Sequence, residues 1–102
     1  MAVSKNWSAR TINGVAGFEI IVRGEANVGR LTVLPELVRR SPQGTVSTTL
    51  LLDLLNAVDA TPESFQEVQY NEKIDSIEEY NIVEIFLGNQ SIEEILVERM
   101  KG

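Results

Sequence analysis

Turn-forming residues recur along this chain about every ten residues, and that spacing leaves room only for short elements between them. The turns are expected at Asn13-Gly14, Gly24, Gly29, Pro35, Ser41-Pro42-Gln43-Gly44, Thr61-Pro62, Asn71 and Gly88-Asn89. A succession of short strands produces such spacing. Composition favours the same conclusion, because 26 of the 102 residues are Val, Ile or Thr, whose branched side chains suit a pleated sheet. The sequence predicts one mainly β domain over residues 1–102.

Alternation of apolar and polar side chains indicates where some of the strands lie. Residues 17–23 (GFEIIVR) and residues 81–87 (NIVEIFL) both place every second apolar side chain on one face. A further strand is expected around Leu31 and Val33, joined to the first by a hairpin through residues 23–30.

Two other stretches fit a helix as well as a strand. Residues 45–60 (TVSTTLLLDLLNAVDA) have leucines at helical spacing, but Leu50, Leu52 and Leu54 also alternate as in a buried strand. Residues 91–101 (SIEEILVERMK) begin with a possible helix capping box, although they can also return as a strand after the turn at Gly88. The abundance of β-branched residues favours the strand in both.

Two architectures follow from these alternatives. If both open stretches are strands, about seven strands form a small antiparallel β-sandwich, immunoglobulin-like in size. If both are helices, the fold is α+β, with a four-stranded antiparallel sheet and two helices in the order ββαββα. We expect the sandwich.

The chain contains neither histidine nor cysteine, which removes the commonest catalytic groups. No Ser-His-Asp or Cys-His system and no ordinary zinc site can form within it. Carboxylates do occur as the pairs Glu78-Glu79 and Glu93-Glu94, but neighbours on a strand point in different directions and are expected on a solvated surface. The sequence predicts a protein that is not an enzyme and has no cofactor and no metal site.

Charge is distributed unevenly along the chain, whose net charge is -6. Residues 1–50 carry six basic and three acidic side chains, and residues 51–102 carry three basic and twelve acidic ones. This balance argues against nucleic-acid binding, which needs a clustered basic surface. No apolar run is long enough for a secretion signal or a membrane span, so we expect a soluble, cytoplasmic protein without membrane contact.

Five side chains are candidates for contact with an anion or a partner: Arg23, Arg30, Arg39, Arg40 and Trp7. Guanidinium groups suit phosphate and carboxylate recognition, so the four arginines would form an anion site if folding brought them together. Adjacent arginines on a strand face opposite ways, however, and each can meet an acidic side chain of the same chain instead. Trp7 lies in a polar stretch, where it either covers the edge of the core or anchors a partner.

These observations predict a small non-enzymatic binding or assembly module that acts through protein–protein contacts, either with a protein partner or by self-association. Sheet edges are natural sites of self-pairing, and the two oppositely charged halves suggest complementary surfaces. The alternative is a small-molecule or anion-binding protein that uses the arginine cluster.

Overall fold

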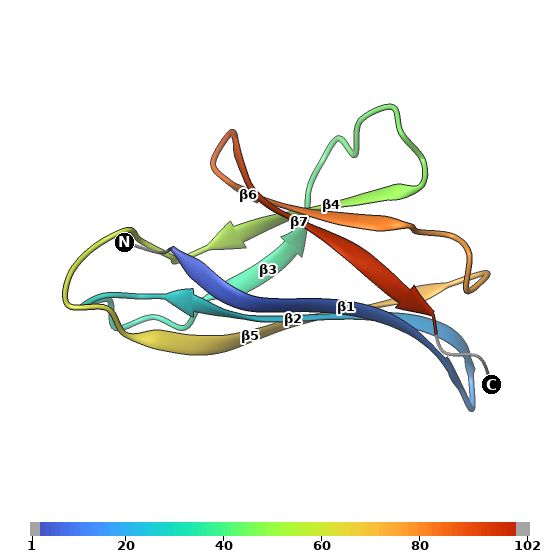
Figure 1. The fold of residues 1–102 in the computed structure, drawn as a ribbon, viewed down its shortest axis with the longest axis horizontal. Coiled ribbons are helices and arrows are strands. Elements are labelled where there is room, and N and C mark those ends of the chain that lie inside the picture. The colour runs from blue at the N-terminus through green and yellow to red at the C-terminus, as the bar shows by residue number, and fades with distance from the viewer. Residues whose placement is uncertain (1–2, 100–102) are drawn as a thin grey trace.

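Short strands account for all the regular structure in the computed structural model, which describes residues 3–99 (Figure 1). Those residues contain no helix, and therefore none that is long and apolar enough to cross a membrane. The prediction of a mainly β fold is confirmed, and the α+β alternative is wrong. The seven strands are β1 (Ser4–Gly14), β2 (Gly17–Asn27), β3 (Glu36–Arg39), β4 (Thr49–Leu55), β5 (Phe65–Ile74), β6 (Ile82–Leu87) and β7 (Gln90–Arg99).

Both stretches that the sequence left open contain a strand. The first contains β4, in which Leu50, Leu52 and Leu54 are buried while the residues between them are half-buried. The second belongs to β7 as far as Arg99, and its last two residues lie outside the described residues. Because β4 packs against the core with one face, its buried leucines follow the two-residue period of a strand and not the spacing of a helix.

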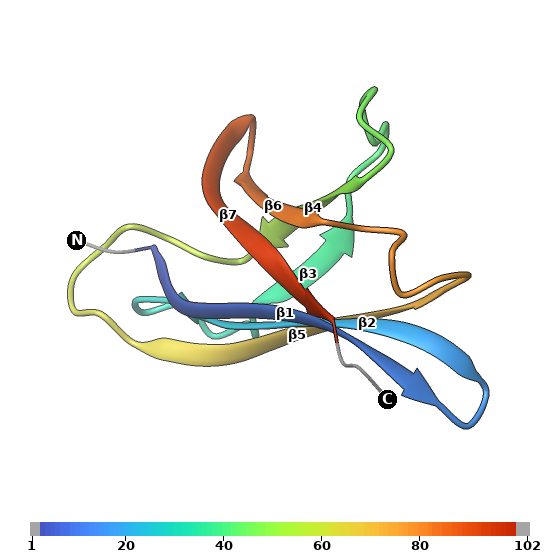
Figure 2. The same cartoon turned by 45° about the vertical axis from the view of Figure 1, so that its right-hand side comes forward.

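The strands form one sheet, in the order β3-β4-β6-β7-β1-β2-β5. β7 makes it continuous, because β7 pairs with β6 as far as Leu96 and with β1 from Val97 onward. Figures 1 and 2 show β7 crossing from one group of strands to the other. The predicted sandwich of two separate sheets is therefore replaced by one curled sheet. It is not wholly antiparallel either, since β4–β6 and β7–β1 are parallel pairs.

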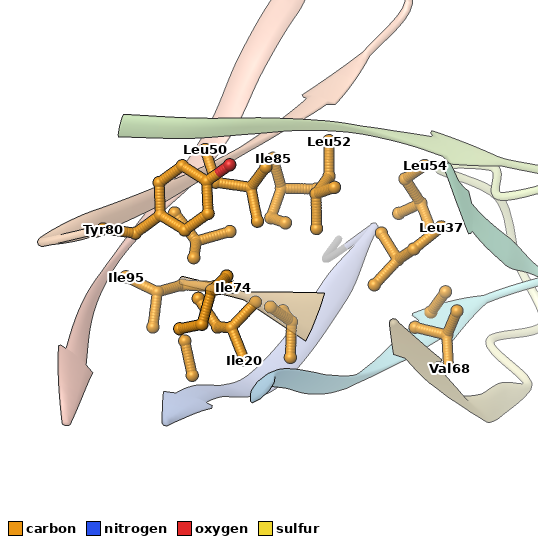
Figure 3. Packing of buried hydrophobic residues seen from close by; sticks show 14 residues of the cluster. Ile20, Leu37, Leu50, Leu52, Leu54, Val68, Ile74, Tyr80, Ile85 and Ile95 are labelled. Atoms are coloured by element: carbon orange, nitrogen blue, oxygen red, sulfur yellow. The ribbon is translucent and has the colours of Figure 1, made fainter. Parts of the chain in front are cut away.

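The core lies between the group β3, β4 and β6 and the group β1, β2 and β5 (Figure 3). Each group presents alternate apolar side chains to the other, as the pattern of residues 17–23 and 81–87 predicts. Close packing of these side chains fixes how one group crosses the other. The apolar side chains with no exposed surface include Ile20, Val22, Leu50, Leu52, Val83 and Ile85.

The sheet is nearly closed, because its two outer strands approach each other. Cα atoms of β3 and β5 come within 8 Å, but no hydrogen-bonded ladder joins the two strands in the described part of the chain. We call this junction between β3 and β5 the seam. Main-chain groups at a sheet edge attract other chains, so an edge that faces its own sheet is partly protected.

The segment around Leu31 and Val33 is a loop, so the prediction of a strand there is wrong. β2 continues to Asn27 and is flanked on both sides, by β1 and by β5. No edge of β2 is left for a hairpin partner, and the next strand begins only at Glu36. The β2–β3 loop (residues 28–35) thus connects the group β1, β2 and β5 to the group β3, β4 and β6.

Candidate functional site

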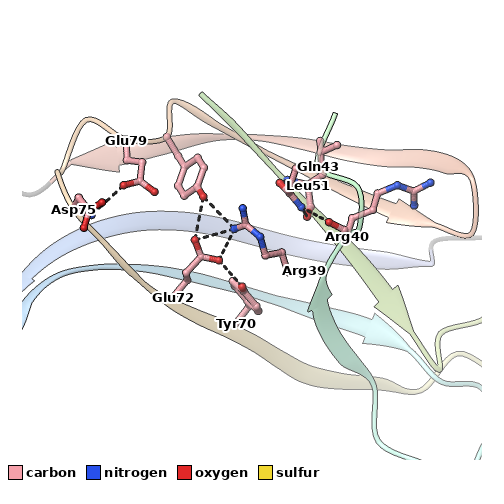
Figure 4. Close-up of polar contacts among 9 residues, drawn as sticks. Arg39, Arg40, Gln43, Leu51, Tyr70, Glu72, Asp75 and Glu79 are labelled. Carbon is pink, nitrogen blue, oxygen red and sulfur yellow. Dashed lines mark hydrogen bonds and ion pairs between the residues drawn. The ribbon is translucent and has the colours of Figure 1, made fainter. Parts of the chain in front are cut away.

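The side chains of Arg39, the last residue of β3, and of Arg40, which follows it, point in opposite directions (Figure 4). Arg39 points into the seam toward Glu72 of β5, whereas Arg40 points toward the turn between β6 and β7. Alternation along a strand requires this separation. The two guanidinium groups therefore do not form one basic site.

Arg39 belongs to a polar network that occupies the seam (Figure 4). Its Nη1 donates to both carboxylate oxygens of Glu72, at 2.7 and 2.9 Å, and lies 3.1 Å from the Tyr80 hydroxyl. Tyr70 and Tyr80 donate their hydroxyls to the same carboxylate, at 2.6 and 3.0 Å. Glu72 faces inward on β5, opposite Ile20, and needs these donors because an unpaired carboxylate is costly away from water.

The two tyrosines of this network have shifted pKa values. Burial, and after it the hydrogen bond to Glu72, raises the pKa of Tyr70 to about 12. Burial also raises the pKa of Tyr80 above its ordinary value. Ionising either hydroxyl would place a second negative charge beside the carboxylate of Glu72, so both tyrosines are neutral donors at neutral pH.

Arg40 holds the turn between β6 and β7. It forms an ion pair with Asp53 at 2.5 Å and donates to the carbonyl of Gly88 at 2.9 Å. It also donates to the side chain of Asn89 at 3.3 Å, and its guanidinium lies 4.3 Å from the ring centre of Phe86. The anion site remains a prediction, but its two central arginines are already committed to partners within the chain.

The other two predicted arginines lie elsewhere. Arg23 is exposed on β2 and donates to Gln69 of β5 at 2.9 Å. Arg30 is exposed in the β2–β3 loop. Folding thus distributes the four predicted arginines over four places, each with different surroundings.

Trp7 packs against the chain rather than standing out from it. It is half-buried against the core, and its indole Nε1 donates to Ser4 at 2.8 Å. The ring lies directly on Gly24, where a Cβ atom would come within 2.3 Å of it. Only glycine at this position of β2 lets the indole approach so closely. This packing favours the cover over the partner anchor as the role of Trp7, and that role stays a prediction.

The acidic side chains are dispersed and take part in local contacts. Glu79 accepts a hydrogen bond from the backbone of Asp75 at 3.0 Å, and Glu84 accepts one from Ser91 at 2.7 Å. Among residues 3–99, no group of three or more acidic side chains is arranged to hold a metal ion. The two oppositely charged halves of the sequence are also interleaved, because β1 and β2 lie between β7 and β5.

Sequence reasoning missed an apolar surface at one end of the barrel. It combines three side chains of the β2–β3 loop with the last residue of β4, and each side chain is between 41% and 76% exposed. Asn56 joins the two segments, since its side chain donates to the Leu34 carbonyl at 3.1 Å. The signal was the aliphatic run LTVLP, which alternation assigned to a strand. We call this surface the loop-end patch: Leu31, Val33, Leu34 and Leu55.

Asn27 fixes the loops that carry this patch. Its side chain is fully buried, and its Oδ1 accepts hydrogen bonds from the backbone of Gly29 at 2.9 Å and of Ser64 at 3.0 Å. Its Nδ2 donates to the carbonyl of Ala60 at 3.1 Å. One side chain therefore ties the β2–β3 loop to the β4–β5 loop (residues 56–64), and both views of the fold place these loops at the same end (Figures 1 and 2).

Comparison of the chain with protein-family models, with curated proteins and with solved structures finds no match.

Proposed function

We propose that this chain is a small binding or assembly module that works through protein–protein contact, with the loop-end patch as its contact surface. One observation carries the proposal: among residues 3–99, four of the seven exposed large apolar side chains lie in the β2–β3 loop and at the adjoining end of β4. Contiguous exposed apolar surface on a small protein marks sites of interaction, because covering it removes apolar area from water.

The remaining exposed apolar side chains do not form a second surface of this kind. Val15 lies in the β1–β2 turn, Val46 in the β3–β4 loop and Leu96 on β7. Single exposed apolar side chains are ordinary on protein surfaces and need no partner. The clustering of the other four is what distinguishes the loop-end patch.

The patch is also held in place before any partner arrives. Pro35 is buried at the end of the loop, and the buried Asn27 fixes the loop at its beginning. Gly29 adopts a positive φ of 54° between them, a conformation that glycine takes at little cost. A loop ordered in this way loses little conformational entropy when it binds, which favours affinity.

This support differs from the support that the sequence offered. Self-pairing through open sheet edges has less basis in a nearly closed sheet, whose seam is bridged by Arg39 and Glu72. Attraction between a basic half and an acidic half also loses its basis, because their strands are interleaved. The contact surface that remains is the apolar one.

Two matched variants test the proposal. Leu34 is 76% exposed in the patch and Leu96 is 77% exposed outside it, so Leu34→Glu and Leu96→Glu place the same charge at equally open positions. Tagged wild type and both variants would be incubated with an extract of the source cells that also contains the untagged chain. Captured proteins would then be identified by mass spectrometry, and circular dichroism would confirm that all three are folded.

We expect at least one protein, the untagged copy included, to be captured by wild type and by Leu96→Glu but lost with Leu34→Glu. A set of captured proteins that is the same for all three would overturn the patch as the contact surface. So would a folded wild type that captures nothing.

A further inference from the structure

We propose that the partner at the loop-end patch is a second copy of this chain, placed by a two-fold axis so that residues 30–36 of the two copies run antiparallel. This inference rests on the proposed function and names the partner at the same surface. It depends on a property of the segment that the apolar side chains alone do not supply, namely opposite charges at its two ends.

The segment reads Arg-Leu-Thr-Val-Leu-Pro-Glu from residue 30 to residue 36. Arg30 and Glu36 are both exposed, and the exposed Leu31, Val33 and Leu34 lie between them. A positive charge, an apolar stretch and a negative charge thus follow one another along one loop. Read in the opposite direction, the order of charges is reversed.

A two-fold axis brings the same surface of both copies together, so the surface must be complementary to itself. An antiparallel arrangement of two such segments meets this condition. Leucine and valine side chains of one copy cover those of the other, while Arg30 of each copy faces Glu36 of its partner copy. A parallel arrangement would instead place like charges together, which is unfavourable.

Neither charge is engaged in an ion pair within residues 3–99. The ion pairs within the described residues are Arg39–Glu72 and Arg40–Asp53, and neither Arg30 nor Glu36 takes part in one. Glu36 lies at the first position of β3, opposite the patch residue Leu55, so its charge is at the border of the apolar surface. Charges at such a rim set the orientation of a contact, while the apolar centre supplies most of the affinity.

Charge reversal tests the arrangement without disturbing the fold. In a two-fold dimer of Arg30→Glu, the introduced carboxylate of each copy would face Glu36 of the other, and in a dimer of Glu36→Arg two arginine pairs would form. Each single variant should therefore dimerise roughly tenfold more weakly than wild type. Sedimentation equilibrium across a dilution series at low salt measures this, in the micromolar range expected of a small interface.

The decisive sample is an equimolar mixture of the two single variants. In the antiparallel mixed dimer, one contact pairs the two introduced charges, which have opposite sign, and the other pairs the two native ones. A parallel mixed dimer would also pair opposite charges, but in that arrangement neither single variant would associate more weakly than wild type, because like charges already face each other there. We therefore expect association stronger than that of either single variant, and weaker association when salt screens the charges. Leu96→Glu serves as the control and should associate like wild type. Thermal unfolding of each protein alone shows whether both variants are folded. The double variant Arg30→Glu/Glu36→Arg should regain dimerisation, because its two antiparallel contacts again pair opposite charges.

Two results would overturn the inference. One is a wild type that remains monomeric at every concentration; if Leu34→Glu still abolishes capture of a different protein, the contact surface stands and only the second copy is refuted. The other is a mixture that associates no better than its components. Loss of self-association with Leu34→Glu alongside such a mixture would refute the antiparallel arrangement while leaving the patch as the contact.

Discussion

Arg39 of β3 and Glu72 of β5 join the two outer strands of the sheet through a two-oxygen contact at 2.7 and 2.9 Å. These strands have no ladder between them in the described part of the chain, so side chains supply the connection that main-chain hydrogen bonds make elsewhere in the sheet. An inward-facing charge near a sheet edge also discourages other strands from pairing there. Arg39, a candidate binding residue in the sequence, thus bridges the two outer strands of the nearly closed sheet.

Glu72→Gln should lower the free energy of unfolding by about 1–3 kcal/mol, because the amide cannot accept from Arg39 and both tyrosines at once. Urea unfolding followed by circular dichroism measures the change. Glu67→Gln is the matched control, since Glu67 is exposed on the same strand and should change stability by no more than about 0.5 kcal/mol. Equal effects of the two substitutions would contradict a structural role for the seam network.

Tyr70 and Tyr80 in the seam should lose their protons at a higher pH than tyrosines of the unfolded chain. Tyr70 and Tyr80 are the only two in the chain, so tyrosinate absorbance reports on this network alone. With the pKa of Tyr70 raised to about 12, the unfolded chain releases its proton first as the pH rises from about 10. The contribution of protonated Tyr70 to the stability of the folded protein is therefore fully present below about pH 10 and is lost as the pH rises toward about 12. Native protein whose two tyrosines ionise at the same pH as in urea would refute this.

Local alternation located β2 and β6, because burial from one side imposes a period of two on a strand, whereas it left β4 and β7 open between strand and helix. It also separated Arg39 from Arg40, whose partners Glu72 and Asp53 lie on different strands. The same rule failed at Leu31 and Val33, which alternate but belong to a loop. What excludes a strand there is the double pairing of β2, and that pairing depends on residues far along the chain.

Local sequence patterns could not predict the single sheet or the position of the loop-end patch, for the same reason. β7 becomes the joint between two groups of strands only through its parallel pairing with β1, and nothing near residue 97 records that contact. The exposure of Leu34 likewise depends on where the barrel ends. Sequence reasoning therefore found the β-rich character of the chain and some of its strands, whereas the closure of the sheet decided which apolar side chains remained outside.

Asn27→Ala should destabilise the protein by about 2–4 kcal/mol, since it leaves the amides of Gly29 and Ser64 without their buried acceptor. Faster hydrogen exchange is expected at those two amides in particular, and weaker binding through the patch should accompany it. Asn13→Ala at an exposed position of β1 is the control and should leave exchange at both amides unchanged. An Asn27→Ala variant as stable as that control would show that the loops are held by other contacts.

Thr11→Val should stabilise the protein by about 1 kcal/mol, opposite in sign to most core substitutions. Thr11 is fully buried on β1, and its hydroxyl has no hydrogen-bond partner among residues 3–99. Valine keeps the shape and the β-branch but removes the buried polar atom, so packing is retained while a desolvation cost disappears. Thr11→Ala removes the same hydroxyl together with a methyl group and should lower stability by leaving a cavity. Urea unfolding of the three proteins separates these effects, and a loss of stability in Thr11→Val would mean that the hydroxyl is satisfied within the folded protein.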